Sequence, residues 1–257
     1  MKHFGKVTRA TPISKFLGKG SKGGKNSLKN MANSQKMTIV VARHNENLEW
    51  LKTLAWDYIV YNKGEELPKW VKNVVNLQNI GREAHTYLTY IIDHYDNLPD
   101  YVAFVQGDPY SHTWHLIKKM HHFEHLVEKA LKFNASCDFY ALSDSVLIAD
   151  GFGRPDHPGL MIGESAKKIF LKNIQLFRFP MGAQFISSKR AILFHTKETY
   201  QVILDYLIKA EPAKDPKNTH RSPEDAISPG YKNLFSGWVM ERLWPTLLDC
   251  EHKTIYD

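Results

Sequence analysis

The sequence predicts an α/β fold in which helices cover both faces of a mainly parallel central sheet. Short runs of β-branched and aromatic residues alternate with amphipathic stretches from residue 38 onward. These runs are continuously apolar, which is typical of parallel strands buried on both faces. Hydrophobic residues make up 43% of the chain and aromatic residues 12%, which is ample for a core. We therefore expect one domain over residues 38–250, flanked by tails at 1–37 and 251–257.

Strands are expected where short apolar runs end in polar or turn-forming residues. The first run, from Thr38 to Arg43, is followed by Asn45, which suits the cap of an amphipathic helix with leucines at 48, 51 and 54. Further strands are predicted at 58–61, 74–77, 101–106, 139–142 and 183–188, and further helices at about 82–95, 113–133, 191–210 and 231–248. The stretch 143–163 is predicted to be rich in loops. Residues 211–230 carry four prolines among polar residues, which predicts a long loop of the kind that forms a lid or a binding loop.

The positive charge of the chain is concentrated at its N-terminus. The formal charge is +7, but residues 1–36 hold nine lysines and arginines and no acidic residue, which leaves 25 basic against 27 acidic residues elsewhere. A nucleic-acid enzyme normally carries its positive field on the folded surface, so a nucleic-acid partner is not expected for the domain. The glycine- and lysine-rich tail is predicted to be disordered. It suits either a solubilising extension or a weak electrostatic tether to lipid or nucleic acid.

Several other classes are not expected. The apolar runs fall short of the roughly 20 residues that a membrane-spanning helix needs. The N-terminus lacks the continuous apolar segment of a secretory signal, so we expect a cytoplasmic protein. Two cysteines, Cys137 and Cys250, are too few for a disulfide framework and have no zinc-ligand spacing around them.

Polar and charged residues follow each of the first four predicted strands. The carboxyl ends of parallel strands meet at one edge of a sheet, and ligands bind there. The sequence therefore predicts one site at this edge, formed by four independent placements. They are Arg43 and Asn45 after the first strand, Asn62 and Lys63 after the second, Asn79, Gly81, Arg82 and Glu83 after the third, and Gly107 and Asp108 after the fourth.

Asp108 is the sharpest candidate of this set. A carboxylate directly after a buried strand, between Gly107 and Pro109, suits an oxygen ligand for Mg²⁺ or Mn²⁺. The same metal ion would also bind a diphosphate. The alternative is an aspartate that caps the following turn. Three cations, Arg43, Lys63 and Arg82, would supply positive charge for a diphosphate leaving group, although each alone also fits an ordinary surface charge.

Five histidines between residues 112 and 125 are a second candidate metal site. His121 and His125 lie at positions i and i+4 of a predicted helix, a spacing that can hold a transition metal. A solvated helix face is the commoner explanation of such a pattern. His112 is different, because it lies four residues after Asp108 and is placed to join it at the sheet edge.

Two further segments carry residues suited to chemistry. The segment Phe179 to Phe185 combines a turn, an aromatic pair and the amide of Gln184, which suits a sugar-binding wall or, equally, a strand that enters the core. Glu241 lies on a predicted helix between two tryptophans, an environment that favours a raised pKa and a role as a base. Its alternative role is an ion pair with Arg242 or another cation.

These segments together resemble domain-of-unknown-function family 3431 in order from residue 38 to 248. The resemblance is carried by Val-Val-Ala-Arg-His-Asn-Glu-Asn-Leu-Glu-Trp-Leu (40–51), Tyr-Asn-Lys-Gly (61–64), Asn-Ile-Gly-Arg-Glu-Ala-His-Thr-Tyr-Leu (79–88), Phe-Val-Gln-Gly-Asp-Pro (104–109), Phe-Pro-Met-Gly-Ala-Gln-Phe (179–185) and Glu-Arg-Leu-Trp (241–244). The family in turn looks like a relative of the GT-A glycosyltransferases, whose fold begins with a similar strand and Asn-rich turn. The Asn-x-Gly-Arg-Glu block is similar to an Asn-x-Gly-Arg-Asp segment of some polysaccharide-building transferases.

The resemblance implies a GT-A-like glycosyltransferase that moves a sugar from a nucleotide-diphosphate donor to a carbohydrate hydroxyl, assisted by Mn²⁺ or Mg²⁺. Asp108 would stand in the place of the metal-binding Asp-x-Asp motif, whose first position here is Gln106. The implied roles are donor binding by Arg43, Asn45, Lys63, Gly81, Arg82 and Glu83, acceptor binding by Phe179, Gly182, Gln184 and Trp244, metal binding by Asp108 and His112, and catalysis of an inverting transfer by Glu241 as the base.

Two other functions remain open from the sequence. One is a metal-dependent hydrolase that uses Asp108 and the histidines, which stoichiometric zinc in the protein would favour. The other is a non-catalytic module that recognises glycan or nucleotide at the sheet edge, which donor binding without turnover would favour.

Overall fold

The fold is built on a six-stranded, mostly parallel sheet, as the sequence predicts. The computed structural model describes residues 36–133, 135–171, 173–210 and 236–248, all within the second of two units into which the chain divides after Ser34. The strand order is β3-β2-β1-β4-β8-β5. The first four of these are parallel, and β8 runs antiparallel to both of its neighbours. Their bounds are β1 Met37–Arg43, β2 Asp57–Asn62, β3 Val74–Asn76, β4 Tyr101–Gln106, β5 Phe139–Ala141 and β8 Phe185–Ser188.

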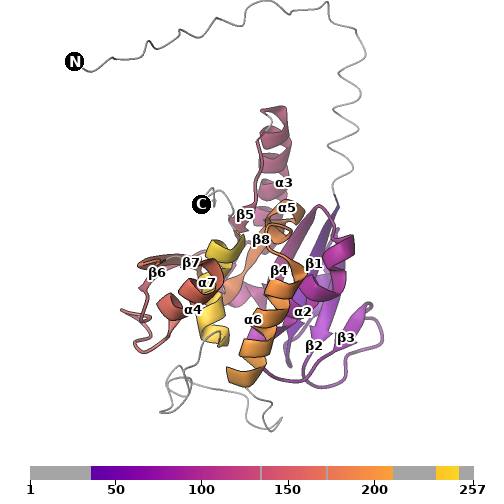
Figure 1. Cartoon of the computed structure of the whole chain (residues 1–257). Coiled ribbons are helices and arrows are strands. Elements are labelled where there is room, and N and C mark those ends of the chain that lie inside the picture. Colours follow the sequence, from indigo (N-terminus) through magenta and orange to yellow (C-terminus); the bar gives the residue numbers. More distant parts are fainter. Residues whose placement is uncertain (1–35, 134, 172, 211–235, 249–257) are drawn as a thin grey trace, which may run out of the picture. The chain divides into compact units, whose positions relative to one another are not determined.

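Helices cover the sheet on both faces, because alternate residues of the central strands enter two separate cores. In β1, Val40 belongs to one core, whereas Ile39 and Val41 belong to the other. The first core is closed by α2 (Arg82–His94), α6 (Lys197–Ala210) and α7 (Gly237–Leu248), and the second by the 3₁₀ turn η1 (Glu49–Thr53) and α3 (Leu116–Lys132). Figure 1 shows α2, α6 and α7 together on one side of the sheet.

A second, two-stranded sheet has its first strand inside the stretch 143–163, which the sequence predicts to be rich in loops. Strands β6 (Val146–Asp150) and β7 (Leu176–Pro180) pair antiparallel, and α4 (Ile162–Phe170) lies in the connection between them. A long segment separates β6 from β7 in the sequence, so no short turn motif between them predicts that they pair. Phe177 and Phe179 of β7 point into the first core, and this burial gives the small sheet its place beside α7.

Three helices differ from their predicted extents. The helix expected after Asn45 is the single 3₁₀ turn η1, and the one expected from 113 begins at Leu116. The stretch 191–210 is two helices, α5 (Lys189–Ile192) and α6, because the backbone N–H groups of Ala191 and Thr199 are capped by the hydroxyls of Ser188 and Thr196. A short 3₁₀ turn, η2 (Tyr95–Asn97), continues α2. Residues 1–35 and 251–257 of the predicted tails lie outside the described residues, as do the proline-rich loop at 211–230 and the start of the helix expected from 231. The first strand begins at Met37, one residue before the predicted start of the domain.

No helix within the described residues is long and apolar enough to cross a membrane.

Trp244 of α7 anchors this helix in the first core. Its side chain is fully buried, and its ring lies 5.8 Å from that of Tyr87 and 5.6 Å from that of Phe185. Replacing Trp244 with Ala should lower the free energy of unfolding by about 3–5 kcal/mol, because it removes a large buried side chain and leaves a cavity. Urea unfolding measures this loss. Trp114, which is 76% exposed, is the matched control, and Trp114→Ala should change stability by no more than about 0.5 kcal/mol. Equal effects of the two substitutions would contradict the packing described.

Candidate functional site

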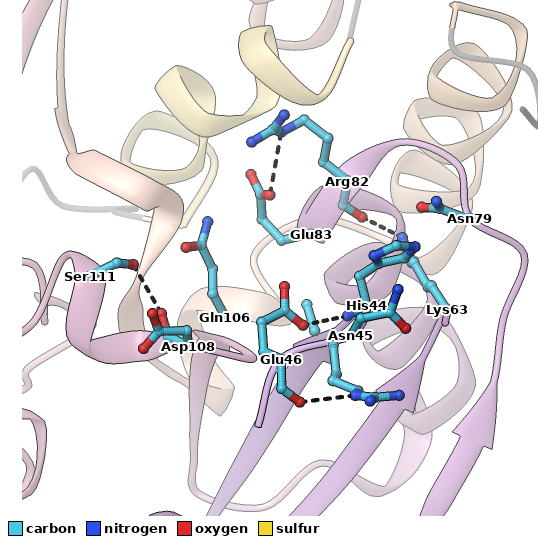
Figure 2. Close-up of a pocket in the computed structure, with 12 residues that line it drawn as sticks. His44, Asn45, Glu46, Lys63, Asn79, Arg82, Glu83, Gln106, Asp108 and Ser111 are labelled. Atoms are coloured by element: carbon cyan, nitrogen blue, oxygen red, sulfur yellow. Dashed lines mark hydrogen bonds and ion pairs between the residues drawn. The ribbon is translucent and has the colours of Figure 1, made fainter. Parts of the chain in front are cut away.

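A cavity of about 600 Å³ opens at the carboxyl edge of the parallel strands. The strand register creates it, because Arg43 at the end of β1 pairs with Asn62 of β2, and Ala42 pairs with Gln106 of β4. The segments that leave these strands therefore start at the same level. Figure 2 shows their side chains around a common space. Its lining comprises Ala42, Arg43, His44, Asn45, Glu46, Lys63, Asn79, Arg82, Glu83, Gln106, Asp108 and Ser111.

Arg43 holds the floor of this cavity together. Its Nη1 donates to Asn62 Oδ1 at 2.7 Å and to the Glu65 carbonyl at 2.6 Å, and its Nε donates to the Glu46 carbonyl at 3.2 Å. The side chain is buried, and burial lowers the pKa of the guanidinium although the charges of Glu46 and Glu65 raise it. Most of the hydrogen-bonding capacity of Arg43 is therefore used on the protein itself rather than offered to a ligand.

The turns after β1 and β2 are locked against each other. Asn45 Oδ1 accepts a hydrogen bond from the Glu65 backbone N–H at 2.9 Å. Gly64 lies so close that an added Cβ would stand 1.9 Å from the His44 carbonyl oxygen and 2.2 Å from Asn45 Oδ1. Only glycine allows this approach, so the Asn-Lys-Gly sequence after β2 has a steric cause.

Lys63 fixes the segment that leads into α2. Its Nζ donates to the Ile80 carbonyl at 2.8 Å and to the Arg82 carbonyl. Gly81 and Arg82 both have left-handed backbone conformations, with φ of 58° and 51°. Gly81 lies outside the cavity lining, and its role is packing, because a Cβ there would lie 2.8 Å from the side chain of Leu207 in α6. The consequence is a sharp entry into α2 that aims Arg82 and Glu83 at the cavity.

Arg82 and Glu83 form the wall of the cavity beneath α7. The Arg82 guanidinium lies 4.6 Å above the ring of Trp238, and its Nε is 3.7 Å from Glu83 Oε2 (Figure 2). Glu83 is only 8% exposed. Burial raises the pKa of its carboxyl group. The positive charges of Arg82 and Lys63 lower this pKa, and the negative charge of Glu241 raises it. Glu83 is thus a desolvated carboxylate at the edge of an open cavity.

The remaining carboxylates of the lining are Glu46 and Asp108. Glu46 Oε2 accepts the His44 backbone N–H at 2.6 Å and packs on Gly107, where a Cβ would lie 2.5 Å away from it. Asp108 is exposed, immediately before the 3₁₀ turn η3 (Pro109–Ser111). Across the described ranges, no three His, Cys, Asp or Glu side chains gather into a group able to hold a metal ion.

The predicted acceptor residues do not line this cavity. Phe179 and Trp244 are buried in the first core, and the Phe179 ring is covered by the Arg242 guanidinium at 4.6 Å. Gln184 is fully buried, and its amide accepts from the Gln106 N–H and donates to the Pro109 carbonyl and Thr113 Oγ1. The sequence allows this segment to be either a sugar-binding wall or a strand that enters the core, and the structure shows the core strand.

Glu241 lies one layer behind the cavity. Its Oε1 accepts the Gly182 backbone N–H at 2.7 Å, and its Oε2 accepts from Arg242 Nη1 at 2.7 Å. Gly182 also faces His112, whose ring carbon Cδ2 would be 2.3 Å from an added Cβ. His112 therefore packs on the turn η4 (Met181–Ala183), outside the cavity lining, rather than beside Asp108 as a second ligand.

The other four histidines of the predicted 112–125 group lie on α3 and its approach, away from the cavity lining. His121 is exposed, with Nδ1 3.1 Å from Glu124 Oε2 and its ring 4.8 Å from that of Trp56. His125 is exposed on the same helix, and this face fits the solvated alternative of the sequence analysis.

The predicted residues that the structure brings together at the cavity are Arg43, Asn45, Lys63, Asn79, Arg82, Glu83 and Asp108. Sequence reasoning missed Glu46 and Ser111, and it gave no role to His44. Only their position in the sequence could have indicated that they line the cavity, because each lies within the turn that follows β1 or β4.

Residues 39–140 match the model of a family described as a protein of unknown function (DUF3431). This match supports the family that the sequence resembles, and it spans the strands and turns that line the cavity. Glu241 and the segment around Gln184 lie beyond the matched range. Comparison with curated proteins gives no match.

The three hydrogen bonds of Arg43 form a clamp between the turns after β1 and β2. Substitution of Arg43 should therefore reduce the stability of the protein more than substitution of Arg82. Arg43→Lys should lower the free energy of unfolding by about 1–3 kcal/mol, because an ammonium cannot reproduce the fork that serves three acceptors in two turns. Arg82→Lys is the control and should cost less than about 1 kcal/mol, since its head group is partly exposed. Chemical denaturation of both variants measures the difference, and a larger loss in Arg82→Lys would overturn the clamp.

Proposed function

We propose that the chain is a glycosyltransferase that moves a sugar from a nucleotide-diphosphate donor to a carbohydrate hydroxyl. The supporting observation is the cavity at the carboxyl edge of the parallel strands, which gathers three cations and three carboxylates from four strand ends. Ligands of open α/β sheets bind at this edge. A volume of about 600 Å³ falls in the range of small-molecule and cofactor sites.

The donor diphosphate would be bound by the side of the cavity formed by Lys63 and Arg82. The Arg82 side chain is 42% exposed and its guanidinium is held over the Trp238 ring, so it offers hydrogen-bond donors at little conformational cost. Lys63 adds charge while its ammonium fixes the backbone of residues 80–82. Arg43 would contribute through the rigidity of the floor and through its charge, since its donors serve the two turns. Asn45 closes the same floor.

The proposed metal, Mg²⁺ or Mn²⁺, would be held by Asp108. Mg²⁺ commonly binds through one or two carboxylates and completes its shell with water and substrate phosphates, so a single exposed aspartate at the cavity fits this mode. A bound cation would neutralise charge on the diphosphate as it leaves. The fit is to a metal shared with the donor, because the residues present form no cage of their own.

The donor site can be tested by calorimetry with a panel of nucleoside diphosphates in the presence of Mn²⁺ or Mg²⁺. We expect one nucleotide to bind with a Kd in the micromolar to millimolar range, and Arg82→Met to weaken it at least tenfold because a cation near the phosphates is lost. Lys118→Met, an exposed lysine on α3 outside the cavity, is the control and should bind as the parent does. If no nucleotide of the panel binds to the parent, the proposal fails.

Asp108→Asn should remove the dependence of nucleotide binding on the metal. In the parent we expect Mn²⁺ to tighten nucleotide binding by at least tenfold, whereas the variant should bind equally with and without the metal because the anionic oxygen ligand is lost. Titrations in metal and in EDTA measure both ratios. Glu46→Gln is the matched control, because Glu46 is committed to the His44 N–H, and it should keep the response to the metal. Unchanged metal dependence in Asp108→Asn would refute this role.

A further inference from the structure

Glu83 is a carboxylate that faces the cavity from the first turn of α2. It is 8% exposed, it lines the cavity, and its nearest cation, Arg82, has its Nε at 3.7 Å, beyond hydrogen-bond distance. In Figure 2 the Glu83 side chain lies between the Arg82 guanidinium and the space beside Gln106. A buried carboxylate with this access is available to a ligand in a way that a fully hydrogen-bonded one is not.

Glu241 is the neighbouring carboxylate on α7, and each of its two oxygens accepts a hydrogen bond. One oxygen accepts the Gly182 N–H and the other accepts from Arg242. Arg242 is itself fixed, because it donates to the Trp238 carbonyl at 2.7 Å and lies 2.7 Å from His157 Nδ1. Glu241 is therefore held rigidly in one orientation outside the cavity lining, where it cannot reach a substrate without giving up both bonds.

The two carboxylates differ in a way that separates their roles. Burial raises the pKa of Glu83, and the negative charge of Glu241 adds to this rise. Arg82, a hydrogen bond from the backbone N–H of Glu83 itself, and Lys63 lower it. Arg242 and Tyr87 are the other titratable groups that interact with the Glu83 charge. A carboxylate whose pKa is raised by burial and that borders a cavity is suited to accept a proton from a ligand there.

We propose that Glu83 is the base that accepts the proton of the attacking carbohydrate hydroxyl, and that Glu241 is a positioning residue behind it. This inference rests on the proposed function. The hydroxyl oxygen would form a bond to the anomeric carbon as the bond from that carbon to the diphosphate oxygen breaks and its electron pair leaves with the diphosphate. The hydroxyl proton passes to the ionised Glu83 carboxylate and from there to solvent. In this proposal Glu83 acts in catalysis and not in donor binding, and Glu241 supports the site and is not the base.

The test uses the full chain, the nucleotide sugar whose nucleotide binds best, and a carbohydrate or water as acceptor. Glu83→Gln should lower kcat at least 100-fold with the donor KM changed less than threefold, because the proton acceptor is removed while the cationic side of the cavity stays. Glu83→Asp, which keeps the carboxylate, should recover part of this loss. Circular dichroism and thermal melting of each variant confirm that it is folded. Should Glu83→Gln fail to fold, the inference is judged from Glu83→Asp, whose kcat must fall while its donor KM is kept.

The pH profile separates a base from a merely structural residue. The acidic limb of kcat against pH should follow Glu83, because activity requires the ionised form. Glu241→Gln removes the charge that raises the pKa of Glu83, so this limb should move to lower pH while the activity above it remains within tenfold of the parent. A merely structural effect of this substitution would lower the whole profile without moving the limb.

Each failure points to a different part of the argument. Absence of nucleotide binding to the parent removes the proposed function, and the base assignment with it. Donor binding with full turnover in Glu83→Gln removes the base alone, as does a parallel loss of donor affinity, which would return Glu83 to binding. Donor binding by the parent without turnover on any acceptor, water included, removes both the transfer and the base.

Discussion

The hydrogen bonds of Arg43 are the constraint on which the cavity depends. One guanidinium joins the turn after β1, the end of β2 and the carbonyl of Glu65, and it is buried beneath them. Two of its three acceptors are backbone carbonyls, so the side chain acts on the path of the chain itself. Removing one partner of such a buried cluster leaves polar groups without water or protein partners, which is costly. The turns that present His44, Asn45 and Lys63 are therefore held in place before any ligand arrives.

A second set of buried polar contacts fixes the opposite side. Gln184 binds the Gln106 N–H, the Pro109 carbonyl and Thr113 through one amide, which ties the loop carrying Asp108 to the start of β8. Beside it, Gly182 joins His112 to Glu241 of α7. The cavity thus has a supporting layer whose members do not face it. This layer includes Gly182 and Gln184, which the sequence assigned to the acceptor, His112, which it assigned to the metal, and Glu241, which it assigned to the base.

The difference between prediction and structure follows from what a sequence pattern specifies. Strand ends were predictable, because a continuous apolar run fixes where a parallel strand stops and topology then brings those ends together. The roles of Phe179 and Gln184 were not, since aromatic rings beside an amide fit both a sugar-binding wall and a core strand, and only the tertiary contacts decide. Strands β6 and β7 pair across α4, and no local signal announces such a pairing. The metal role of His112 assumed that its side chain turns towards Asp108, whereas it packs on Gly182.

The charges of the lining constrain any anionic ligand. The lining holds three cations, Arg43, Lys63 and Arg82, and three carboxylates, Glu46, Glu83 and Asp108, so its formal charges sum to zero. A diphosphate would add negative charge to this balanced site, and it would be unfavourable near a desolvated carboxylate such as Glu83. A divalent cation beside the exposed Asp108, shared with the donor, would offset this charge when the donor binds. The hydroxyl proton that the ionised Glu83 accepts would remove the charge of that carboxylate as the diphosphate leaves. The placement of one exposed and one buried carboxylate on the two sides of the cavity is therefore suited to a reaction in which a diphosphate leaves while a hydroxyl loses its proton.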